Sequence, residues 1–223
     1  MIPLIVIPAY NEEKAIGQVL ENLKKGGYTN ILVINDGSQD KTEEIVKKHQ
    51  VNYLSHAINR GLGGALGTGL KAAKKMGVEI AITFDADGQH AVEDLAKVIA
   101  PLKNKEAEVV IGSRLLNPEG MPLHRRLFNW IGNIVTYVLF GIWVTDSQSG
   151  LRAFSKKALQ VIDIKTNKME VSSEIIREIG ANNLKLKEIP IKAIYTEYSL
   201  SKGQNFFVGV KTFIKLVIHR LMH

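Results

Sequence analysis

The chain has 223 residues, no cysteine and a formal net charge of +7. Its length suits one domain with a substantial core, and its composition, 45% hydrophobic and 23% charged, excludes global disorder. Without cysteine, disulfides, thiolate zinc sites and a cysteine nucleophile are excluded, and a reducing cytoplasm is compatible. The first residues enter an apolar run with no basic leader, so we expect no signal peptide.

The charge is divided unevenly between the two halves of the chain. Residues 1–112 carry 13 basic against 14 acidic side chains, a net charge of −1, whereas residues 113–223 carry 16 against 8, a net charge of +8. A basic half favours an anionic partner such as a phosphate-bearing lipid, a membrane surface or nucleic acid. We expect no nucleic acid, because no aromatic residues interleave a basic stripe and the first half is net acidic.

The first half alternates short apolar runs with segments of helical periodicity. The runs predict strands at 2–7, 31–34, 52–55, 80–84 and 109–111. Between them, apolar residues recur every three or four positions, which predicts helices at 12–25, 40–49, 62–76 and 92–103. This alternation predicts an α/β fold whose mainly parallel sheet is covered by helices on both faces.

In such sheets, ligands bind beyond the carboxyl ends of the strands. Polar or glycine-rich segments follow the predicted strands there, and we expect them to converge on one edge; they are 8–13, 35–38, 56–64 and 85–89. Asp85 and Asp87 are the most informative, because like charges one residue apart repel unless a cation lies between them. Their oxygens suit Mg2+ or Mn2+, although this segment alone also fits a solvated Asp-Gly turn.

Two further motifs allow alternative interpretations. Asp36, in Asp36-Gly-Ser38, could bind a nucleotide's ribose or base, or could belong to a turn in which Asp40 caps the next helix. The segment Asn59-Arg-Gly-Leu-Gly-Gly-Ala65 lets backbone approach a ligand closely, or forms a tight helix start. It matches neither the dinucleotide fingerprint nor a P-loop.

The second half contains an uncharged stretch of 18 residues, Leu127–Val144, preceded by Arg125 and Arg126. This is the lower limit for a membrane span. Polar residues dilute it, and a span would separate 146–150 from the first half, so we expect a buried or interfacial helix. Residues 205–222 predict a C-terminal amphipathic helix that packs on the core or lies on anionic lipid, with one stripe formed by Lys211, Lys215 and His219.

Taken together, these segments resemble the family 2 glycosyltransferases in order and spacing. Three later motifs are similar to the dolichyl-phosphate mannose synthase branch, whose acceptors are polyprenyl phosphates: Gly112-Ser-Arg114, Asp146-Ser-Gln-Ser-Gly-Leu-Arg152 and Ser201-Lys202. The resemblance covers about residues 2–204. It implies a glycosyltransferase-A catalytic domain over 1–204 followed by the amphipathic helix at 205–223, a nucleotide-sugar donor, Mg2+ or Mn2+, and inversion at the sugar carbon.

The resemblance also implies site residues. It assigns nucleotide-sugar contacts to Pro8, Tyr10, Glu12, Ile34, Asp36, Asp85, Ala86 and Lys202. It assigns metal binding to Asp85, Asp87 and Gln89, and catalytic roles to Asp87, Arg114, Asp146 and Gln148. It places Arg114 and Lys202 near donor or acceptor phosphates. Apart from the resemblance, an anionic acceptor phosphate needs cations to position it, and the basic half offers Arg114, Arg125, Arg126 and Arg152 for this role. The chain departs from the branch at Ser149, where cysteine is usual, and at Tyr195-Thr-Glu197, where an arginine is usual.

The chemistry of the acceptor separates the functional alternatives. A lipid phosphate is already anionic and needs cations, whereas a hydroxyl acceptor needs a general base. Asp146 could be that base, or could orient Arg152 or a backbone turn. We expect a hexosyltransferase that moves mannose or glucose to a polyprenyl phosphate, peripheral at the cytoplasmic face of an anionic membrane. The resemblance also allows a membrane-anchoring partner protein.

The sequence is also compatible with two other functions. One is a related transferase acting on a hydroxyl of a glycan, lipid or cell-wall precursor, with Asp146 as its base. The other is a non-catalytic nucleotide-sugar-binding protein. The second is disfavoured because an inactive site has no physical reason to keep two carboxylates that repel each other.

Overall fold

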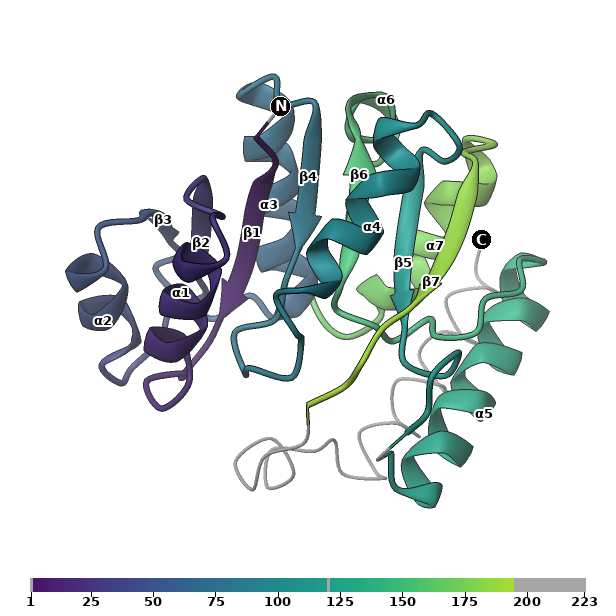
Figure 1. Ribbon diagram of the computed structural model, residues 1–223, viewed down its shortest axis with the longest axis horizontal. Helices are drawn as coiled ribbons and strands as arrows, with labels where there is room; N and C mark the ends of the chain where they lie inside the picture. Colours follow the sequence, from purple (N-terminus) through teal and green to yellow (C-terminus); the bar gives the residue numbers. More distant parts are fainter. Residues whose placement is uncertain (1, 120, 195–223) are drawn as a thin grey trace.

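The computed structural model describes residues 2–119 and 121–194, which build one seven-stranded sheet between helices (Figure 1). In chain order the elements are β1 (Leu4–Ala9), α1 (Ile16–Lys25), β2 (Ile31–Asn35), α2 (Thr42–Lys48), β3 (Asn52–Ser55), α3 (Leu62–Lys75), β4 (Ile80–Thr83), α4 (Asp94–Lys103), β5 (Val109–Ser113), α5 (Leu123–Phe140), β6 (Arg152–Ser155), α6 (Lys156–Val161), α7 (Val171–Ala181) and β7 (Leu186–Pro190).

The sheet has the strand order β3-β2-β1-β4-β6-β5-β7. Neighbouring strands are parallel except at β6, which is antiparallel to both β4 and β5. The mainly parallel sheet expected from the sequence is therefore confirmed. β6 and β7 were not predicted, because β6 begins with a charged residue and β7 is partly exposed and interrupted by Lys187 and Glu188.

Two apolar cores lie on opposite faces of the sheet, because successive side chains of a strand point to opposite sides. On β1, Ile5 and Ile7 pack with α1, α2 and α4, whereas Leu4 and Val6 pack with α3, α6 and α7. Figure 1 shows α1 and α4 on one face and α3 and α7 on the other. Each fully buried aliphatic side chain stabilises the fold by roughly 1.5–3 kcal/mol.

The helices expected in the first half are confirmed as α1 to α4, although α1 begins later than expected, at Ile16. The uncharged stretch forms α5, with different bounds from those expected. Arg125 and Arg126 lie inside it, and it ends at Phe140 because Gly141 adopts a left-handed conformation, with φ of 72°. Within residues 2–119 and 121–194, no helix is both long and apolar enough to cross a membrane.

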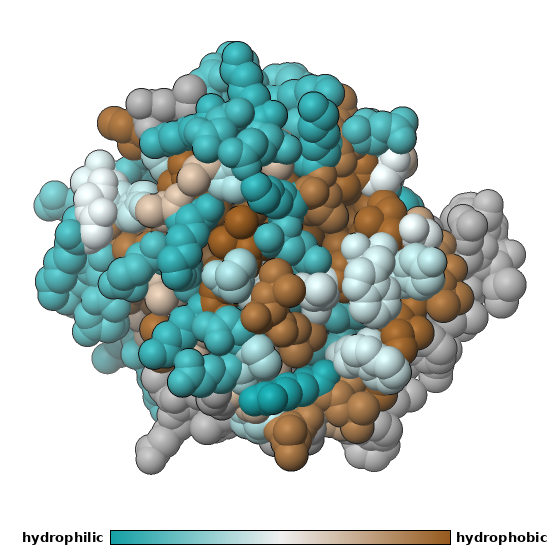
Figure 2. Space-filling model, turned by 45° about the vertical axis from the view of Figure 1, so that its right-hand side comes forward, coloured by the Kyte–Doolittle hydropathy of each residue, from teal (hydrophilic) through white to brown (hydrophobic). Residues whose placement is uncertain are grey.

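The polarity of α5 is reversed relative to an ordinary surface helix. Its inward side carries Asn133 and Thr136, each 1% exposed. Its outward side carries large apolar residues that are about half exposed or more, among them Leu123, Leu127, Phe128, Trp130, Ile131, Tyr137 and Val138. Figure 2 turns this side of the molecule forward and shows apolar surface gathered there. An exposed apolar area of this kind marks an interaction surface.

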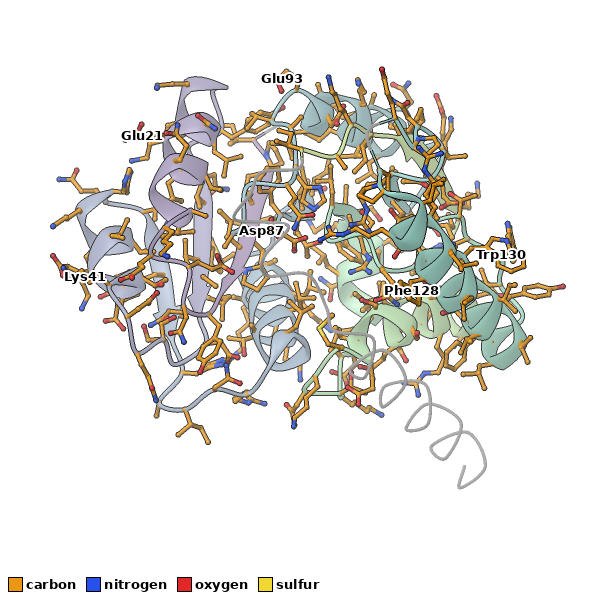
Figure 3. All side chains as sticks on the ribbon, turned by 90° about the horizontal axis from the view of Figure 1, so that it is seen from below. Glu21, Lys41, Asp87, Glu93, Phe128 and Trp130 are labelled. Atoms are coloured by element: carbon orange, nitrogen blue, oxygen red, sulfur yellow. The ribbon has the colours of Figure 1, made fainter. Side chains whose placement is uncertain are left out.

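The carboxyl ends of β1, β2, β3 and β4 lie together at the edge of the sheet that faces down in Figure 1, and Figure 3 shows the molecule from that side. The loops after them are joined by backbone hydrogen bonds, from Asp36 N to Ala9 O at 2.8 Å and from His56 N to Asn35 O at 2.9 Å. The expected convergence of polar segments is therefore confirmed for the described loops. Lys202 and the helix predicted at 205–222 lie outside the described residues.

Candidate active site

Two carboxylates, those of Asp85 and Asp87, follow the end of β4. Figure 3 places Asp87 between the β1–β4 part of the molecule and α5. Beside it, His90 is 5% exposed and its Nε2 donates to Asp85 Oδ2 at 3.0 Å. His90 Nδ1 is buried with no hydrogen-bond partner among the described residues.

The two carboxyl groups have opposite pKa shifts. Burial works to raise the pKa of Asp85, but the hydrogen bond from His90 and the charges of His90, Arg114 and Arg152 hold it below its ordinary value. Burial, followed by the negative charge of Asp85, raises the pKa of Asp87. Asp87 is thus a carboxylate whose charge the protein alone does not neutralise, and this is the electrostatic condition that a bound cation relieves.

The residues present fit a hard divalent cation. Asp85 and Asp87 supply carboxylate oxygens and Gln89 supplies an amide oxygen, the donors that Mg2+ and Mn2+ prefer. Gln89 is already oriented by Asp87, to which it donates from N at 3.0 Å and from Nε2 at 2.6 Å. Across the described part of the chain, no group of three or more His, Cys, Asp or Glu side chains forms a complete metal site.

Gly150 brings a distant segment of the chain against this carboxylate pair. A Cβ at Gly150 would lie 1.9 Å from Asp85 Oδ2, a distance that no real contact allows. The hydroxyl of Thr83, the last residue of β4, donates to Gly150 O at 2.8 Å and fixes this approach. The motif that begins at Asp146 therefore packs directly on Asp85.

Arg114 follows β5 and is paired with Asp146. Its Nε and its backbone N donate to Asp146 Oδ2 at 2.7 and 3.0 Å, and its Nη2 donates to Asp146 Oδ1 at 2.8 Å. Asp146 has no exposed surface and Arg114 is 15% exposed. Both Asp146 oxygens are occupied by a cation, which makes a general-base role unfavourable. The residue that Asp146 orients is thus Arg114, not Arg152 as considered from the sequence.

Two residues that the sequence did not reveal hold the loop containing Asp146. Glu188, on β7, accepts from Thr145 N and Thr145 Oγ1 at 2.8 Å, and from Asp146 N at 3.3 Å. Asn133, on α5, donates to Thr145 O and accepts from Ser147 N at 2.9 Å and from Ser147 Oγ at 2.8 Å. Only the tertiary fold brings these residues together, so no local pattern signalled them.

Arg152 is too deeply buried to make the contact with the acceptor phosphate that was predicted from the sequence. Arg152 is 1% exposed, and its Nη2 donates to Ser147 O at 2.8 Å. Burial lowers its pKa to about 10, against the charges of Asp85 and Asp146, so it stays charged at neutral pH. Arg152 therefore acts as a counter-charge beneath the site, because a guanidinium this deeply buried does not present itself to an acceptor.

The two arginines of α5 are placed differently. Arg126 donates from Nε to Met121 O at 3.0 Å and from Nη2 to Pro118 O at 2.6 Å. Its guanidinium therefore closes the turn before α5, which argues against the predicted acceptor role. Arg125 lies one position earlier on the helix and is partly exposed. Its predicted contact with an acceptor phosphate stays a prediction.

A pocket of about 300 Å3 lies at the ends of β1, β2 and β3, and Tyr10, one of the residues predicted to contact the nucleotide sugar, lines it. It is lined by Tyr10, Asn35, Gly37, Ser38, Gln39, Glu43, His56, Ala57, Ile58 and Asn59. Asp36 lies behind this lining and is 2% exposed. Its carboxylate accepts from His56 Nδ1 at 2.6 Å, Arg60 N at 3.0 Å and Gly61 N at 2.7 Å. Asp36 thus anchors the loop that forms one wall of the pocket.

The glycine-rich segment is explained by protein packing. Gly61 has a φ of 89°, and a Cβ there would lie 2.4 Å from Asn167 O. A Cβ at Gly63 would lie 2.2 Å from Thr166 O. The glycines let the chain around residues 166–167 cross the start of α3, so of the two interpretations the tight helix start is the one that the structure supports.

The remaining predicted residues line or support the site. Pro8 and Ile34 are paired neighbours on β1 and β2 with buried side chains, and Ala86 is 4% exposed. The backbone N of Glu12 donates to Thr42 Oγ1 at 2.8 Å, which ties the loop after β1 to α2. The side chain of Gln148 lies 4.0 Å from the Cβ position of Gly132 on α5. Their contacts with a substrate stay predictions.

Comparison with known proteins gives consistent matches over most of the chain. Residues 4–163 match the family "Glycosyl transferase family 2". An uncharacterized protein of Methanocaldococcus jannaschii is 51% identical over 222 residues, which cover 97% of this chain and 91% of that protein. The UDP-N-acetylglucosamine–dolichyl-phosphate N-acetylglucosaminyltransferase of Methanococcus voltae is 44% identical over 239 residues, with coverages of 97% and 95%.

Among solved structures, glucosyl-3-phosphoglycerate synthase from Mycobacterium tuberculosis, in complex with Mn2+, UDP and glucosyl-3-phosphoglycerate, is similar with a TM-score of 0.74. The match covers 98% of this chain and 79% of that chain at 17% identity. At this identity the likeness concerns the fold, and it confirms the predicted α/β glycosyltransferase-A architecture.

Proposed function

The chain belongs to glycosyl transferase family 2, and we propose that it moves a sugar from a nucleotide sugar to the phosphate of a polyprenyl phosphate. In this reaction an acceptor phosphate oxygen attacks the anomeric carbon. The bond from that carbon to the donor diphosphate breaks, and the nucleoside diphosphate leaves with the bonding electrons. Attack opposite the leaving group inverts the configuration at the sugar carbon.

The observation that carries the proposal is the Arg114–Asp146 pair beside the carboxylates of β4. Asp146 is fully buried and both its oxygens accept hydrogen bonds from Arg114, so it is poorly suited to take a proton from a hydroxyl. A phosphate acceptor loses no proton and needs a positioned cation, which Arg114 supplies. This favours the phosphate acceptor over the hydroxyl acceptor with Asp146 as base.

The donor side of the site is divided between two regions. We place the nucleoside in the pocket that Tyr10 and His56 line, and the diphosphate near Asp85, Asp87 and Gln89. These three residues would hold Mg2+ or Mn2+, which supplies positive charge to the departing diphosphate. The presence of both carboxylates, Asp85 and Asp87, also disfavours a non-catalytic binding protein.

The transferred sugar is either a hexose or an N-acetylhexosamine. The sequence suggested mannose or glucose. The relative from Methanococcus voltae is named for transfer of N-acetylglucosamine from its UDP derivative to dolichyl phosphate. Because that relative is 44% identical over nearly all of this chain, we propose UDP-N-acetylglucosamine as the donor, with GDP-mannose and UDP-glucose as the alternatives to test.

The reversed polarity of α5 supports attachment to a membrane surface. Trp130, Tyr137 and Trp143 are 54%, 48% and 50% exposed, and such side chains favour the boundary between water and lipid. The net charge of +8 over residues 113–223 favours anionic headgroups. We propose a peripheral protein at the cytoplasmic face, held by its own surface or by a membrane-anchoring partner protein.

A donor screen tests this proposal. Each nucleotide sugar is added with Mn2+ at the same concentration, so that the stabilisation ranks the donors by affinity; a ligand present at about 100 times its dissociation constant stabilises a folded protein by roughly 2.7 kcal/mol. We expect UDP-N-acetylglucosamine to raise the melting temperature most, and EDTA to remove the increase. Stabilisation by GDP-mannose or UDP-glucose alone would replace the proposed donor, and no stabilisation by any nucleotide sugar would refute the proposed function.

A further inference from the structure

Asn133 is a buried polar residue on the inward side of α5, and every one of its described hydrogen bonds goes to the loop that contains Asp146. Its Nδ2 donates to Thr145 O, and its Oδ1 accepts from both Ser147 N and Ser147 Oγ. The side chain thus holds the residues immediately before and after Asp146. A buried amide left without such partners would destabilise the fold, so the contact is strongly specified.

From this loop the contacts continue to Arg114. Thr145 Oγ1 lies 2.6 Å from Ser113 Oγ, next to Arg114 in the chain, and Asp146 takes three hydrogen bonds from Arg114 itself. Glu188 holds the same loop from the side of β7. Asn133 from α5 and Glu188 from β7 therefore hold the loop that contains Asp146, and Asp146 in turn fixes the orientation of the Arg114 guanidinium.

We propose that Asn133 is a positioning residue for the transfer reaction, through which α5 sets the orientation of Arg114 toward the acceptor phosphate. The inference rests on the proposed function. α5 also carries the exposed apolar surface. The same helix would therefore contact lipid on its outward side and, through Asn133, orient the Arg114 guanidinium that would bind the lipid's phosphate. The nucleoside pocket lies on β1, β2 and β3, away from these contacts.

Thr136 provides a matched control on the same helix. It is as buried as Asn133, but its hydroxyl donates to Gly132 O at 2.9 Å and lies 3.2 Å from Ser173 Oγ on α7. It therefore joins α5 to another helix and not to the Asp146 loop. Asn133→Ala and Thr136→Ala should both lower thermal stability, and only the first should disturb Arg114.

Kinetics with a polyprenyl phosphate acceptor separate the two variants. Asn133→Ala should lower kcat/KM for the acceptor by about 10- to 100-fold, because displacing a positioning group by about 1 Å has effects of this size. Its dissociation constant for UDP with Mn2+ should stay within about twofold of wild type, and Thr136→Ala should stay near wild type in both. In an Arg114→Ala background, Asn133→Ala should cause no further loss of turnover, since its effect passes through Arg114.

A second readout does not depend on the acceptor. The Nε–H of Arg114 donates to buried Asp146, so its NMR signal should exchange slowly with water in wild type and Thr136→Ala, and rapidly in Asn133→Ala. Slow exchange in all three proteins would overturn the inference, as would an Asn133→Ala loss that simply adds to that of Arg114→Ala. Wild-type protein that fails to use polyprenyl phosphate would refute the proposed function instead, and the NMR result would still decide the role of Asn133.

Discussion

Asp146 and Arg114 are joined by three hydrogen bonds, two from the guanidinium and one from the backbone N–H of Arg114. The carboxylate is fully buried, and the arginine keeps 15% of its side chain exposed. The pair therefore presents a cation at the surface of the site and keeps the anion behind it. Hydrogen bonds to a charged partner contribute about 1.5–3 kcal/mol each, so this orientation is firmly held.

Asp87→Asn should separate metal binding from folding. Because the pKa of Asp87 is raised in the folded protein, its ionised form disfavours the fold, and a neutral isostere removes that cost. In metal-free buffer we expect a melting temperature equal to or above that of wild type. With Mn2+ and a nucleoside diphosphate, the increase seen in wild type should disappear. A variant that still gains stability from Mn2+ would remove Asp87 from the metal site.

The same raised pKa gives metal binding a pH dependence. Protons compete with the metal for Asp87, so affinity for Mn2+ should fall as the pH decreases through a range above the ordinary aspartate value. Isothermal titration of Mn2+ with UDP at several pH values measures this. Affinity that is flat from neutral pH down to the ordinary range of aspartate would contradict the raised pKa.

Gly150→Ala should impair the metal site, although residue 150 is not itself a proposed metal ligand. The added methyl group would overlap Asp85 Oδ2, so the Asp85 side chain must move away from His90. We expect weaker Mn2+ binding and a loss of turnover of roughly tenfold or more, because a displaced ligand no longer holds the reacting groups in place. Gly132→Ala is a suitable control, because its Cβ meets its nearest neighbour, Gln148, at an ordinary 4.0 Å. Equal activity of the two variants would show that the approach of Gly150 to Asp85 is unimportant.

Asp36→Ala should weaken binding of nucleoside diphosphate by about 1–3 kcal/mol, the scale of a lost hydrogen bond to a charged group. The physical cause is release of the loop that forms one wall of the pocket, so the amides of Arg60 and Gly61 should exchange faster with solvent. Calorimetry and hydrogen exchange measure the two effects. Unchanged affinity would remove Asp36 from the site, and weakened affinity with unchanged exchange would indicate direct contact with the nucleoside.

Binding to anionic liposomes should be detectable through tryptophan fluorescence. The chain has two tryptophans, Trp130 and Trp143, and both lie on the exposed apolar side near α5. Their emission should shift to shorter wavelength with anionic vesicles at low salt, and much less at high salt, because salt screens the attraction. Emission that ignores anionic vesicles at low salt would contradict the proposed peripheral attachment.

Much of the fold could be predicted from sequence because its signals are local. Apolar runs such as Leu4–Ala9 and the periodic residues of α1 identify strands and helices, and the parallel-sheet rule then collects the polar loops at one edge. β6 was missed because a strand of four residues beginning with arginine has no such signal. The end of α5 was placed too late because its uncharged composition continues past Gly141.

The site was predictable as a set of segments and not as a set of contacts. Asp85 and Asp87 were expected just beyond the end of a strand, where the structure places them. The pairing of Asp146 with Arg114 and the burial of Arg152 depend on contacts between residues more than 30 positions apart or on sheet packing. Asn133 was missed for a related reason, since a polar residue in an apolar stretch looks like dilution of a lipid-facing helix until its partners are known.

The acceptor is identified by transfer of labelled sugar to a polyprenyl phosphate, measured beside transfer to the same polyprenol without phosphate. We expect product with the polyprenyl phosphate and none with the polyprenol. We also expect Arg114→Ala to cost at least as much turnover as Asp146→Asn, because Asp146 acts by holding Arg114. A general base would instead make the loss of Asp146 cost about 100- to 10,000-fold by itself. Equal transfer to both acceptors, or a loss of turnover in Asp146→Asn while Arg114→Ala stays active, would contradict a phosphate acceptor positioned by Arg114.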